Sequence, residues 1–531
     1  MKFLGLFLLL LSVNSPSYIS AQTPVALWQQ CSGGTKSDAG NCIIKTGDGN
    51  YLVAGKTESI DGPVVGNHGG YDAWIVKYDS SGTILWQKCF GGSGDDEALS
   101  LIACRNGGYA FSGYTESYDG DVVGNHLSSD NFRDVWVVKL DNNGIIEWQK
   151  CLGGTASEES HSILQSDDGS FVISGFTQSI DGDVVGNHAV VNNNIWVIRL
   201  SENGSGILQQ KCYGGNLNDE AYAAIQTSDS GYLIAGSTNS NDGDISFNHG
   251  NNDFWILKLN PDLTLSWQKT YGGSDNDKAT TLVECLDGNY IVGGSASSSD
   301  GDVTGHHGTN SSEDFWLVKI NPADSILWQH CYGGNNSDIL NAVCKLPDGS
   351  FVLAGSSNSI GGDVSTQLGN ADGWICLIDE TGNLRGELSL GSSNSEVFNS
   401  VVDDLNNQVI AVGDGGSQLP LFNGGKDEYL VKLRARVVGI DETEIQSSFV
   451  KIFPNPATNK LKIESLNGFG ILSDEISFTL LDAGGRILRR IVLPESRSWQ
   501  IDCSDIAAGF YLYSIGSVVH GFQSGHLIIQ R

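Results

Sequence analysis

The chain has 531 residues with 62 acidic and 30 basic side chains, a net charge of −32, 68 glycines and 10 prolines. This is the composition of a folded protein rich in turns, and its negative charge repels nucleic acid phosphates and anionic lipid headgroups. We therefore exclude nucleic acid and membrane-surface binding. A chain this long requires several domains or a domain built by repetition.

The N-terminus has the pattern of a secretory signal peptide over residues 1–21. Lys2 precedes a run of apolar residues, 3–11, that is too short to span a bilayer as a helix. A polar stretch and Ala21 follow, which predicts cleavage after that alanine. We expect no transmembrane segment in the mature chain, because no later stretch is long and apolar enough.

A repeat of about 60 residues fills positions 22–435. Copies begin at residues 28, 86, 148, 209, 267, 328 and 386. A second aromatic marker precedes an apolar run in each copy, at Trp74, Trp136, Trp196, Trp255, Trp316, Trp374 and Tyr429. These two markers contain all but one of the 12 tryptophans, so the period is not a chance spacing of aromatic residues.

Each copy is predicted to form four short strands, which in the second copy cover residues 99–105, 109–115, 135–140 and 145–151. Turns rich in Gly and Asn join the first strand to the second and the third to the fourth. Four antiparallel strands in seven copies predict an all-β, seven-bladed β-propeller, with a β-solenoid as the competing architecture.

The two ends of the repeat are complementary. The seventh copy has no fourth strand, and an extra strand at residues 25–31 stands before the first copy. We predict that this N-terminal strand completes the last blade beside residues 429–433, which closes the ring and removes two exposed sheet edges. The 11 cysteines follow repeat positions rather than pairs, which favours buried free thiols over a disulfide framework.

The loop between the second and third strands carries the motif Asp-Gly-Asp-Val-Val-Gly-Asn-His. Its polar side chains are candidate ligand-binding residues on one face of the propeller: Asp119, Asp121, Asn125, His126, Asp181, Asp183, Asn187, His188, Asp242, Asp244 and His249. The loops between blades are expected to add exposed acids to this face: Asp95, Asp96, Glu97, Glu158, Glu159, Asp219, Glu220, Asp275 and Asp277.

Three interpretations of the loop motif are open. The aspartates cap local turns by accepting hydrogen bonds from backbone N–H groups, which is the interpretation that we favour. Alternatively they bind calcium, with Asp119, Asp121, Asp181 and Asp183 as candidate ligands, or the histidines build a zinc or catalytic site. Calcium is the one candidate cofactor.

Catalytic motifs are otherwise absent from the sequence, and we assign no catalytic residue. Glu97, Glu158, Glu159 and Glu220 contain the carboxylates that a glycosidase pair requires. However, we interpret them as equivalent positions of successive blades, whereas a catalytic pair breaks the symmetry of the repeat.

A different pattern follows a linker at residues 436–448 and extends from 449 to 531. It contains, in order, Pro454, Asn455 and Pro456, then Gly485, Gly509, Tyr511 and Gly525. These motifs resemble the type A C-terminal sorting domain of the type IX secretion system of Bacteroidetes, although Gln530-Arg531 replaces the usual Lys-rich end. The resemblance implies a small β-sandwich recognised by the secretion machinery, with a generic adhesion sandwich as the alternative.

The repeats resemble the Gly- and Asp-rich propeller arrays of exported proteins in the same bacteria. We therefore expect a secreted or cell-surface propeller that acts as a binding module for a glycan or a protein, without enzymatic activity. The alternatives are a secreted glycoside hydrolase acting on polysaccharides, similar to endoglucanases, and a structural surface protein stabilised by calcium.

Overall fold

The computed structural model describes residues 24–126, 132–188, 191–309, 312–416 and 419–435, and in the tail 450–453, 460–465, 476–481, 487–494, 496, 498–517 and 521–529. The predicted signal peptide, the predicted linker, the Pro454-Asn455-Pro456 motif and Gly485 lie outside these residues. The described part of the chain folds into strands and turns and has no helix that could cross a membrane. It divides into two units, one containing β1 to β28 and the other β29 to β35.

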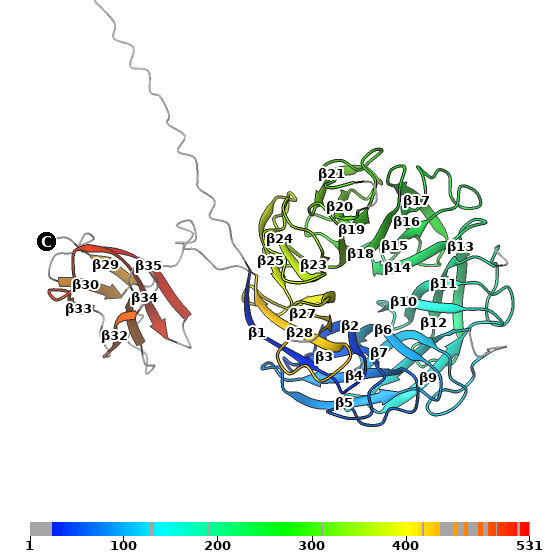
Figure 1. Cartoon of the computed structure of the whole chain (residues 1–531), viewed down its shortest axis with the longest axis horizontal. Helices are drawn as coiled ribbons and strands as arrows, with labels where there is room; N and C mark the ends of the chain where they lie inside the picture. Colours follow the sequence, from blue (N-terminus) through cyan, green and yellow to red (C-terminus); the bar gives the residue numbers. More distant parts are fainter. Residues whose placement is uncertain are drawn as a thin grey trace, which may run out of the picture. The chain divides into compact units, whose positions relative to one another are not determined.

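Seven four-stranded antiparallel sheets surround a central axis, so the predicted seven-bladed propeller is confirmed (Figure 1). The innermost strands, in blades 1 to 7, are β2 (Asp38–Lys45), β6 (Asp96–Ala103), β10 (Glu158–Gln165), β14 (Asp219–Gln226), β18 (Asp277–Glu284), β22 (Asp338–Lys345) and β26 (Val397–Asp403). The second strands are β3 (Tyr51–Thr57), β7 (Tyr109–Thr115), β11 (Phe171–Thr177), β15 (Tyr232–Thr238), β19 (Tyr290–Ala296), β23 (Phe351–Ser357) and β27 (Gln408–Gly415).

The two outer strands of each blade complete the sheets. The third strands are β4 (Asp72–Tyr78), β8 (Asp134–Leu140), β12 (Asn194–Leu200), β16 (Asp253–Leu259), β20 (Asp314–Ile320), β24 (Asp372–Ile378) and β28 (Asp427–Arg434). The outermost strands are β5 (Ile84–Phe90), β9 (Ile146–Leu152), β13 (Ile207–Tyr213), β17 (Leu265–Tyr271), β21 (Ile326–Tyr332), β25 (Leu384–Leu390) and, in blade 7, β1 (Val25–Ser32).

The N-terminal strand closes the ring as predicted. Strand β1 pairs antiparallel with β28, with Gln29 opposite Val431 and Cys31 opposite Tyr429. The Tyr429 hydroxyl donates a hydrogen bond to Gln29 Oε1 at 2.7 Å. The seventh blade therefore contains strands from both ends of the propeller region, and Figure 1 shows the two strands side by side.

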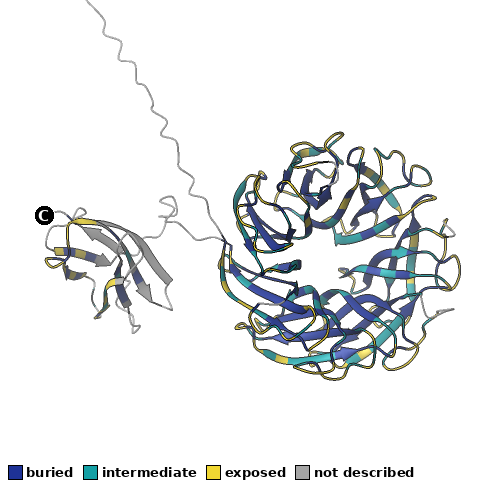
Figure 2. Ribbon diagram, viewed as in Figure 1, coloured by how far each residue is buried: buried dark blue, intermediate teal, exposed yellow. Residues whose placement is uncertain are grey.

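The repeated tryptophan of the third strand forms the core between blades. Trp136 on β8 is fully buried, and its ring meets Phe111 edge-on with centroids 5.6 Å apart. Its indole N–H donates to Gln149 Oε1 on β9 at 2.9 Å, which satisfies the only polar atom of the side chain. Every residue of β8 is buried, as a sheet packed on both faces requires, and Figure 2 shows exposure concentrated in the turns.

The tail forms a second, smaller unit of two antiparallel sheets. One sheet contains β29 (Val450–Phe453), β30 (Lys460–Ser465) and β33 (Ser498–Asp502), and the other contains β31 (Ile476–Leu481), β32 (Ile487–Leu493), β34 (Gly509–Ser517) and β35 (Gly521–Ile529). Buried residues of both sheets share one core, which makes the unit a β-sandwich, as predicted. Tyr511 packs into that core and donates from its hydroxyl to Ala507 O at 2.8 Å, while Gly525 pairs with Tyr513.

The cysteines are free thiols, as predicted, and all except the half-buried Cys42 are buried. Burial raises the pKa of Cys31 and of Cys89 to about 12, so these thiols stay protonated. The cysteines therefore act as small apolar side chains between strands.

Candidate functional site

The propeller has two faces with different connections. The loops between blades and those between second and third strands lie on one face, which we call the loop face. The tight hairpins that join the first strand to the second and the third to the fourth lie on the other, the hairpin face. The innermost strands begin at the loop face, so their first residues surround the loop-face mouth of the channel.

The predicted Asp-Gly-Asp loops bind the neighbouring backbone. Asp119 Oδ1 accepts the N–H of Ser93 at 2.7 Å, and the Asp121 N–H donates to Gly91 O at 2.8 Å. Asn125 donates from its side chain to Ser117 O at 2.8 Å. Blades 3 and 4 repeat these bonds through Asp181, Asp183, Asn187, Asp242, Asp244 and Asn248. The side chains of the first aspartate and of the asparagine, with the backbone N–H of the second aspartate, thus tie the loops together, as turn-forming residues do.

The histidine of the motif bridges two blades. His126 donates from its backbone to Asp134 Oδ2 at 2.8 Å, and its Nδ1 lies 2.8 Å from the same oxygen. Its Nε2 lies 3.6 Å from Asp183 Oδ2 in the next blade. His249 repeats the arrangement. His188 is exposed, and blade 3 has an asparagine where the other blades have the partner aspartate.

The candidate calcium ligands Asp119, Asp121, Asp181 and Asp183 do not converge on a common point. Among the described residues, no three His, Cys, Asp or Glu side chains are gathered as a metal ion requires. The described aspartates of the third strands nevertheless retain a buried carboxylate oxygen without a hydrogen-bond partner: Asp72, Asp134, Asp253, Asp314, Asp372 and Asp427.

Several acids that we expected in exposed inter-blade loops are instead buried at the start of the innermost strands. Asp96 is fully buried and accepts hydrogen bonds from the Ser117 hydroxyl at 2.7 Å, the Gly92 N–H at 2.8 Å and the Thr115 hydroxyl. The same correction applies to Glu158, Asp219 and Asp277. A carboxylate tolerates burial when its oxygens are bound, but burial still raises the pKa of Asp96 to about 6.

The residue after this buried acid reaches the loop-face mouth and varies between blades. We call this position of the seven blades the variable column. In blades 1 to 7 it is Ala39, Glu97, Glu159, Glu220, Lys278, Ile339 and Val397. Our interpretation of the four glutamates as equivalent was therefore wrong. Glu158 is the buried acid of its blade, whereas Glu97, Glu159 and Glu220 belong to the variable column. The variable column breaks the sevenfold repeat.

Glu97 begins a network of polar side chains around the mouth. It is 6% exposed and accepts hydrogen bonds from Asn41 Nδ2 at 2.8 Å and from the Tyr114 hydroxyl at 2.9 Å. Lys56 Nζ of blade 1 lies 3.0 Å from Oε2, the oxygen that also accepts from Tyr114. The carboxylate is thus compensated by a cation and by two hydrogen-bond donors, as a buried charge requires.

Arg133 carries the network from blade 2 to blade 3. Its guanidinium carbon lies 3.9 Å from the centroid of the Tyr114 ring, and its Nε lies 2.9 Å from Glu116 Oε1. Its Nη1 binds Glu159 Oε2 at 2.8 Å. One arginine therefore joins an aromatic ring to carboxylates of two adjacent blades.

His161 carries the network to blades 4 and 5. Its Nδ1 lies 3.8 Å from a carboxylate oxygen of Glu159, and its ring lies 4.8 Å from the ring of Tyr222. Burial lowers the pKa of His161 to about 4, so the imidazole is neutral at physiological pH. Tyr222 donates to Glu220, and Lys278 Nζ lies 3.8 Å from its ring centroid.

These contacts form one continuous arrangement over five blades, which we call the mouth network: Lys56, Glu97, Tyr114, Arg133, Glu159, His161, Glu220, Tyr222 and Lys278. His161 and Tyr222 occupy β-bulges of the innermost strands, and the other blades have a bulge at the same position. Bulges redirect side chains at the rims of barrels and beside binding sites.

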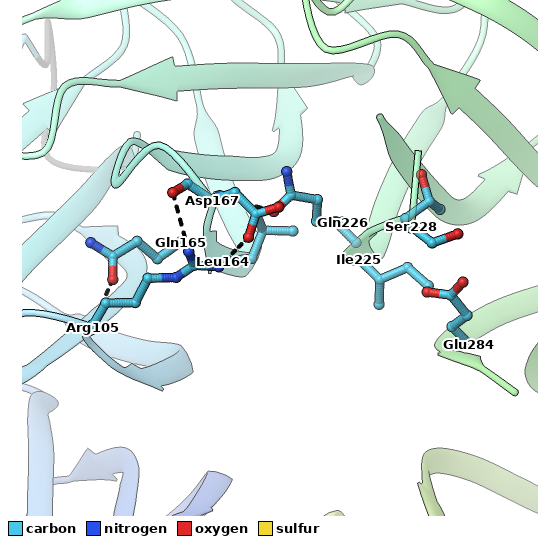
Figure 3. A pocket seen from close by; sticks show the side chains of 10 residues that line it. Arg105, Leu164, Gln165, Asp167, Ile225, Gln226, Ser228 and Glu284 are labelled. Atoms are coloured by element: carbon cyan, nitrogen blue, oxygen red, sulfur yellow. Dashed lines mark hydrogen bonds and ion pairs between the residues drawn. The ribbon is translucent and has the colours of Figure 1, made fainter. Parts of the chain in front are cut away.

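The hairpin face has a hollow of about 480 Å³ at the other end of the channel. Arg105 Nη2 pairs with Asp167 at 2.6 Å, as Figure 3 shows, and the Arg105 backbone N–H donates to Gln165 Oε1 at 2.8 Å. Gln226 accepts the Asp167 N–H at 3.1 Å. These polar groups bind one another across blades 2 to 4, so they hold the ring together at this end.

A smaller cavity of about 300 Å³ lies on the loop face between blades 7 and 1. Its lining residues come from both blades: Ser37, Asp38, Ala39, Asn41, Lys56, Tyr71, Asn399, Asp414 and Lys426. Since Lys56 and Asn41 both bind Glu97, the cavity adjoins the mouth network.

The tail matches a known family. Residues 451–530 match the family model described as the secretion system C-terminal sorting domain. The protein is an exported β-propeller with a type IX sorting tail. Gly509, Tyr511 and Gly525 lie within the matched residues, and the sorting domain directs the propeller to the cell surface or the medium.

The exported propeller has distant similarity to other proteins. The regulatory protein FlaEY of Caulobacter vibrioides is 24% identical over 144 residues, which are 27% of this chain and only 15% of that protein. Hydrazine synthase of Kuenenia stuttgartiensis has a TM-score of 0.44 at 9% identity, over 71% of this chain and 93% of that one. Sqt1 of Chaetomium thermophilum has a TM-score of 0.41 at 12% identity, over 76% and 98% of the two chains.

Proposed function

We propose that this exported propeller is a binding module whose ligand lies across the loop-face mouth of the channel. The supporting observation is the mouth network, which breaks a repeat that is otherwise regular. The buried acid before the variable column is Asp or Glu in every blade, and in every blade its carboxylate accepts the backbone N–H of the residue four positions before it. The fold needs no charge in the variable column, since blades 1, 6 and 7 have Ala39, Ile339 and Val397.

The chemistry of the network supports binding. Glu97 and Glu159 accept hydrogen bonds from Lys56 and Arg133, which present both carboxylates at the mouth together with two cations. Tyr222 adds an aromatic ring beside them. Acceptors, cations and an aromatic surface at a channel mouth suit a polar extracellular ligand such as a glycan or a polypeptide segment.

The proposal is tested by screening the purified protein on glycan and protein arrays and by repeating the capture with variants. Lys278→Met and Tyr222→Phe alter the network without removing a buried charge. We expect each to weaken capture at least about tenfold, or about 1.4 kcal/mol. Arg105→Met on the hairpin face is the matched control and should bind like the wild type.

Two results contradict the proposal. One is capture that survives both network variants unchanged. The other is an equal loss in Arg105→Met, which would place the ligand on the hairpin face. Melting temperatures of all three variants confirm that they are folded.

A further inference from the structure

A repeated backbone bond shows which residues are equivalent where blades meet. Arg133 O accepts the N–H of Glu158 at 2.7 Å between blades 2 and 3. Lys426 O accepts the N–H of Asp38 at 2.6 Å between blades 7 and 1. Arg133 and Lys426 are therefore equivalent. Ala39, which follows Asp38, occupies the position that Glu159 has in blade 3.

The two junctions differ in the partner of the basic side chain. Arg133 reaches across its junction to the carboxylate of Glu159 at 2.8 Å. Lys426 has no such partner, because blade 1 has Ala39 at that position, and it pairs instead with Asp414 of its own blade at 2.5 Å. The Lys426 side chain remains 53% exposed. The cavity of about 300 Å³ is lined by Ala39, Lys426 and Asp414, so it lies where the Glu159 side chain stands in blade 3, with Asp414 as the carboxylate already beside Lys426.

The remaining lining groups define the chemistry of a ligand. Lys56 is a second cation, paired with Glu97 at 3.0 Å and with Nζ 5.0 Å from the Tyr71 ring centroid. Asn41 donates from Nδ2 to Glu97 and to Ala98 O, and Asn399 donates from Nδ2 to Gly40 O at 3.0 Å. Asn41 has used both N–H groups of its amide, which leaves its carbonyl oxygen to accept hydrogen bonds from hydroxyl groups. Asn399 has used one N–H, and its carbonyl oxygen, which accepts from Asn341 Nδ2 at 3.5 Å, has a second lone pair.

We propose that this cavity binds one uronic acid residue of an acidic glycan, with the sugar carboxylate beside Lys426 in the place of the missing glutamate. The hydroxyls of the sugar donate to Asn41, Asn399 and Asp414, and Tyr71 provides an aromatic surface for the ring. A cavity of about 300 Å³ is at the lower end of the size range of ligand pockets and suits a single sugar residue. The inference rests on the proposed binding function and names its ligand class.

Isothermal titration calorimetry of the full chain with digalacturonic acid and with its methyl ester tests this inference, since the ester differs little in size but has no charge. A salt concentration of about 0.15 M limits repulsion by the acidic surface to about 8 Å. We expect the acid to bind at least about tenfold more tightly than the ester. Lys426→Met should abolish this preference, whereas Lys36→Met should keep it. Lys36 is the matched control because it is an equally exposed lysine of the loop face, paired with Glu58.

Ala39→Glu is the sharpest variant, because it supplies the missing carboxylate from the protein itself. We expect it to keep or raise the melting temperature and to lose digalacturonate binding at least about tenfold. Equal binding of acid and ester, undiminished binding by a folded Ala39→Glu variant, or equal binding of a short peptide with a free C-terminal carboxylate would overturn the inference. If Ala39→Glu does not fold, the comparison of Lys426→Met with Lys36→Met decides.

The two proposals fail in different ways. If digalacturonate does not bind but another captured ligand depends on Lys278 and Tyr222, the cavity assignment is wrong and the mouth remains the binding site. If no ligand depends on either set of residues, the proposed function is wrong as well.

Discussion

Deleting residues 22–34 removes β1 and reopens the ring. The strand forms seven residue pairs with β28, from Val25 opposite Arg434 to Ser32 opposite Glu428. At about 0.5–1.5 kcal/mol net for each ladder hydrogen bond, the pairing contributes roughly 4–10 kcal/mol, which is comparable to the total stability of many proteins. The deletion also uncovers Tyr429, which is fully buried against this strand.

Near-ultraviolet circular dichroism of the tryptophans measures the effect as a melting curve. We expect the deletion to lower the melting temperature by at least about 10 °C. The control is a double variant, Val25→Ser and Leu27→Ser, because both side chains are exposed and the backbone pairing is kept. A deletion protein that melts within about 2 °C of the wild type would refute closure by β1 as a source of stability.

Three further predictions concern the buried acids and the loops. The melting temperature should fall as the pH rises from about 4 to about 7. Burial raises the pKa of Asp96 to about 6 and of Glu158 to about 7. In this pH window the folded chain therefore binds more protons than the unfolded chain, and its stability falls as the pH rises. A flat or rising profile in about 0.5 M NaCl, which screens surface repulsion, would contradict this. Asp219→Ala leaves the Gly215 N–H and the Thr238 and Ser240 hydroxyls without their acceptor. It should lower the free energy of unfolding in urea by about 3 kcal/mol or more. Asp242→Ala in the loop should lower it by about 1 kcal/mol or less. A chelator should shift the melting temperature by less than about 1 °C; a larger drop would place a cation at the loop aspartates or at the unpartnered third-strand oxygens.

The architecture was predictable because its determinants recur. A buried tryptophan in the third strand, such as Trp136, needs a hydrogen-bond acceptor on the outermost strand and an apolar partner on the second strand, so the same residue types return in each copy. The closure of the ring by β1 was also predictable. The last copy lacks a fourth strand and an extra strand precedes the first copy, so pairing the two completes the seventh blade. The strand bounds were correct to within a few residues, and β9 begins at Ile146 rather than at residue 145.

The site was not predictable from residue type, because neighbouring acids have different roles. Asp95 accepts the N–H of Tyr71 in the loop, Asp96 is buried among hydroxyl groups, and Glu97 joins the mouth network. Because successive side chains of a strand point in opposite directions, Asp96 and Glu97 have different surroundings. The sequence did not reveal this difference, since we expected all three acids in a loop. One signal was available in the sequence: within a regular repeat, the position after the acid changes from Ala to Glu, Lys, Ile and Val. Variation between otherwise equal copies marks positions that the scaffold does not determine.

Residues at the two ends of one innermost strand allow a direct test of whether the ligand occupies the loop-face mouth. Strand β18 has Thr280 near the loop face and Glu284 at the hairpin face, so Thr280→Trp and Glu284→Trp obstruct opposite ends of the same channel. Binding of the captured ligand to both folded variants is the decisive measurement. We predict that Thr280→Trp loses binding at least about tenfold and that Glu284→Trp keeps it. Retention by Thr280→Trp together with loss in Glu284→Trp would contradict it.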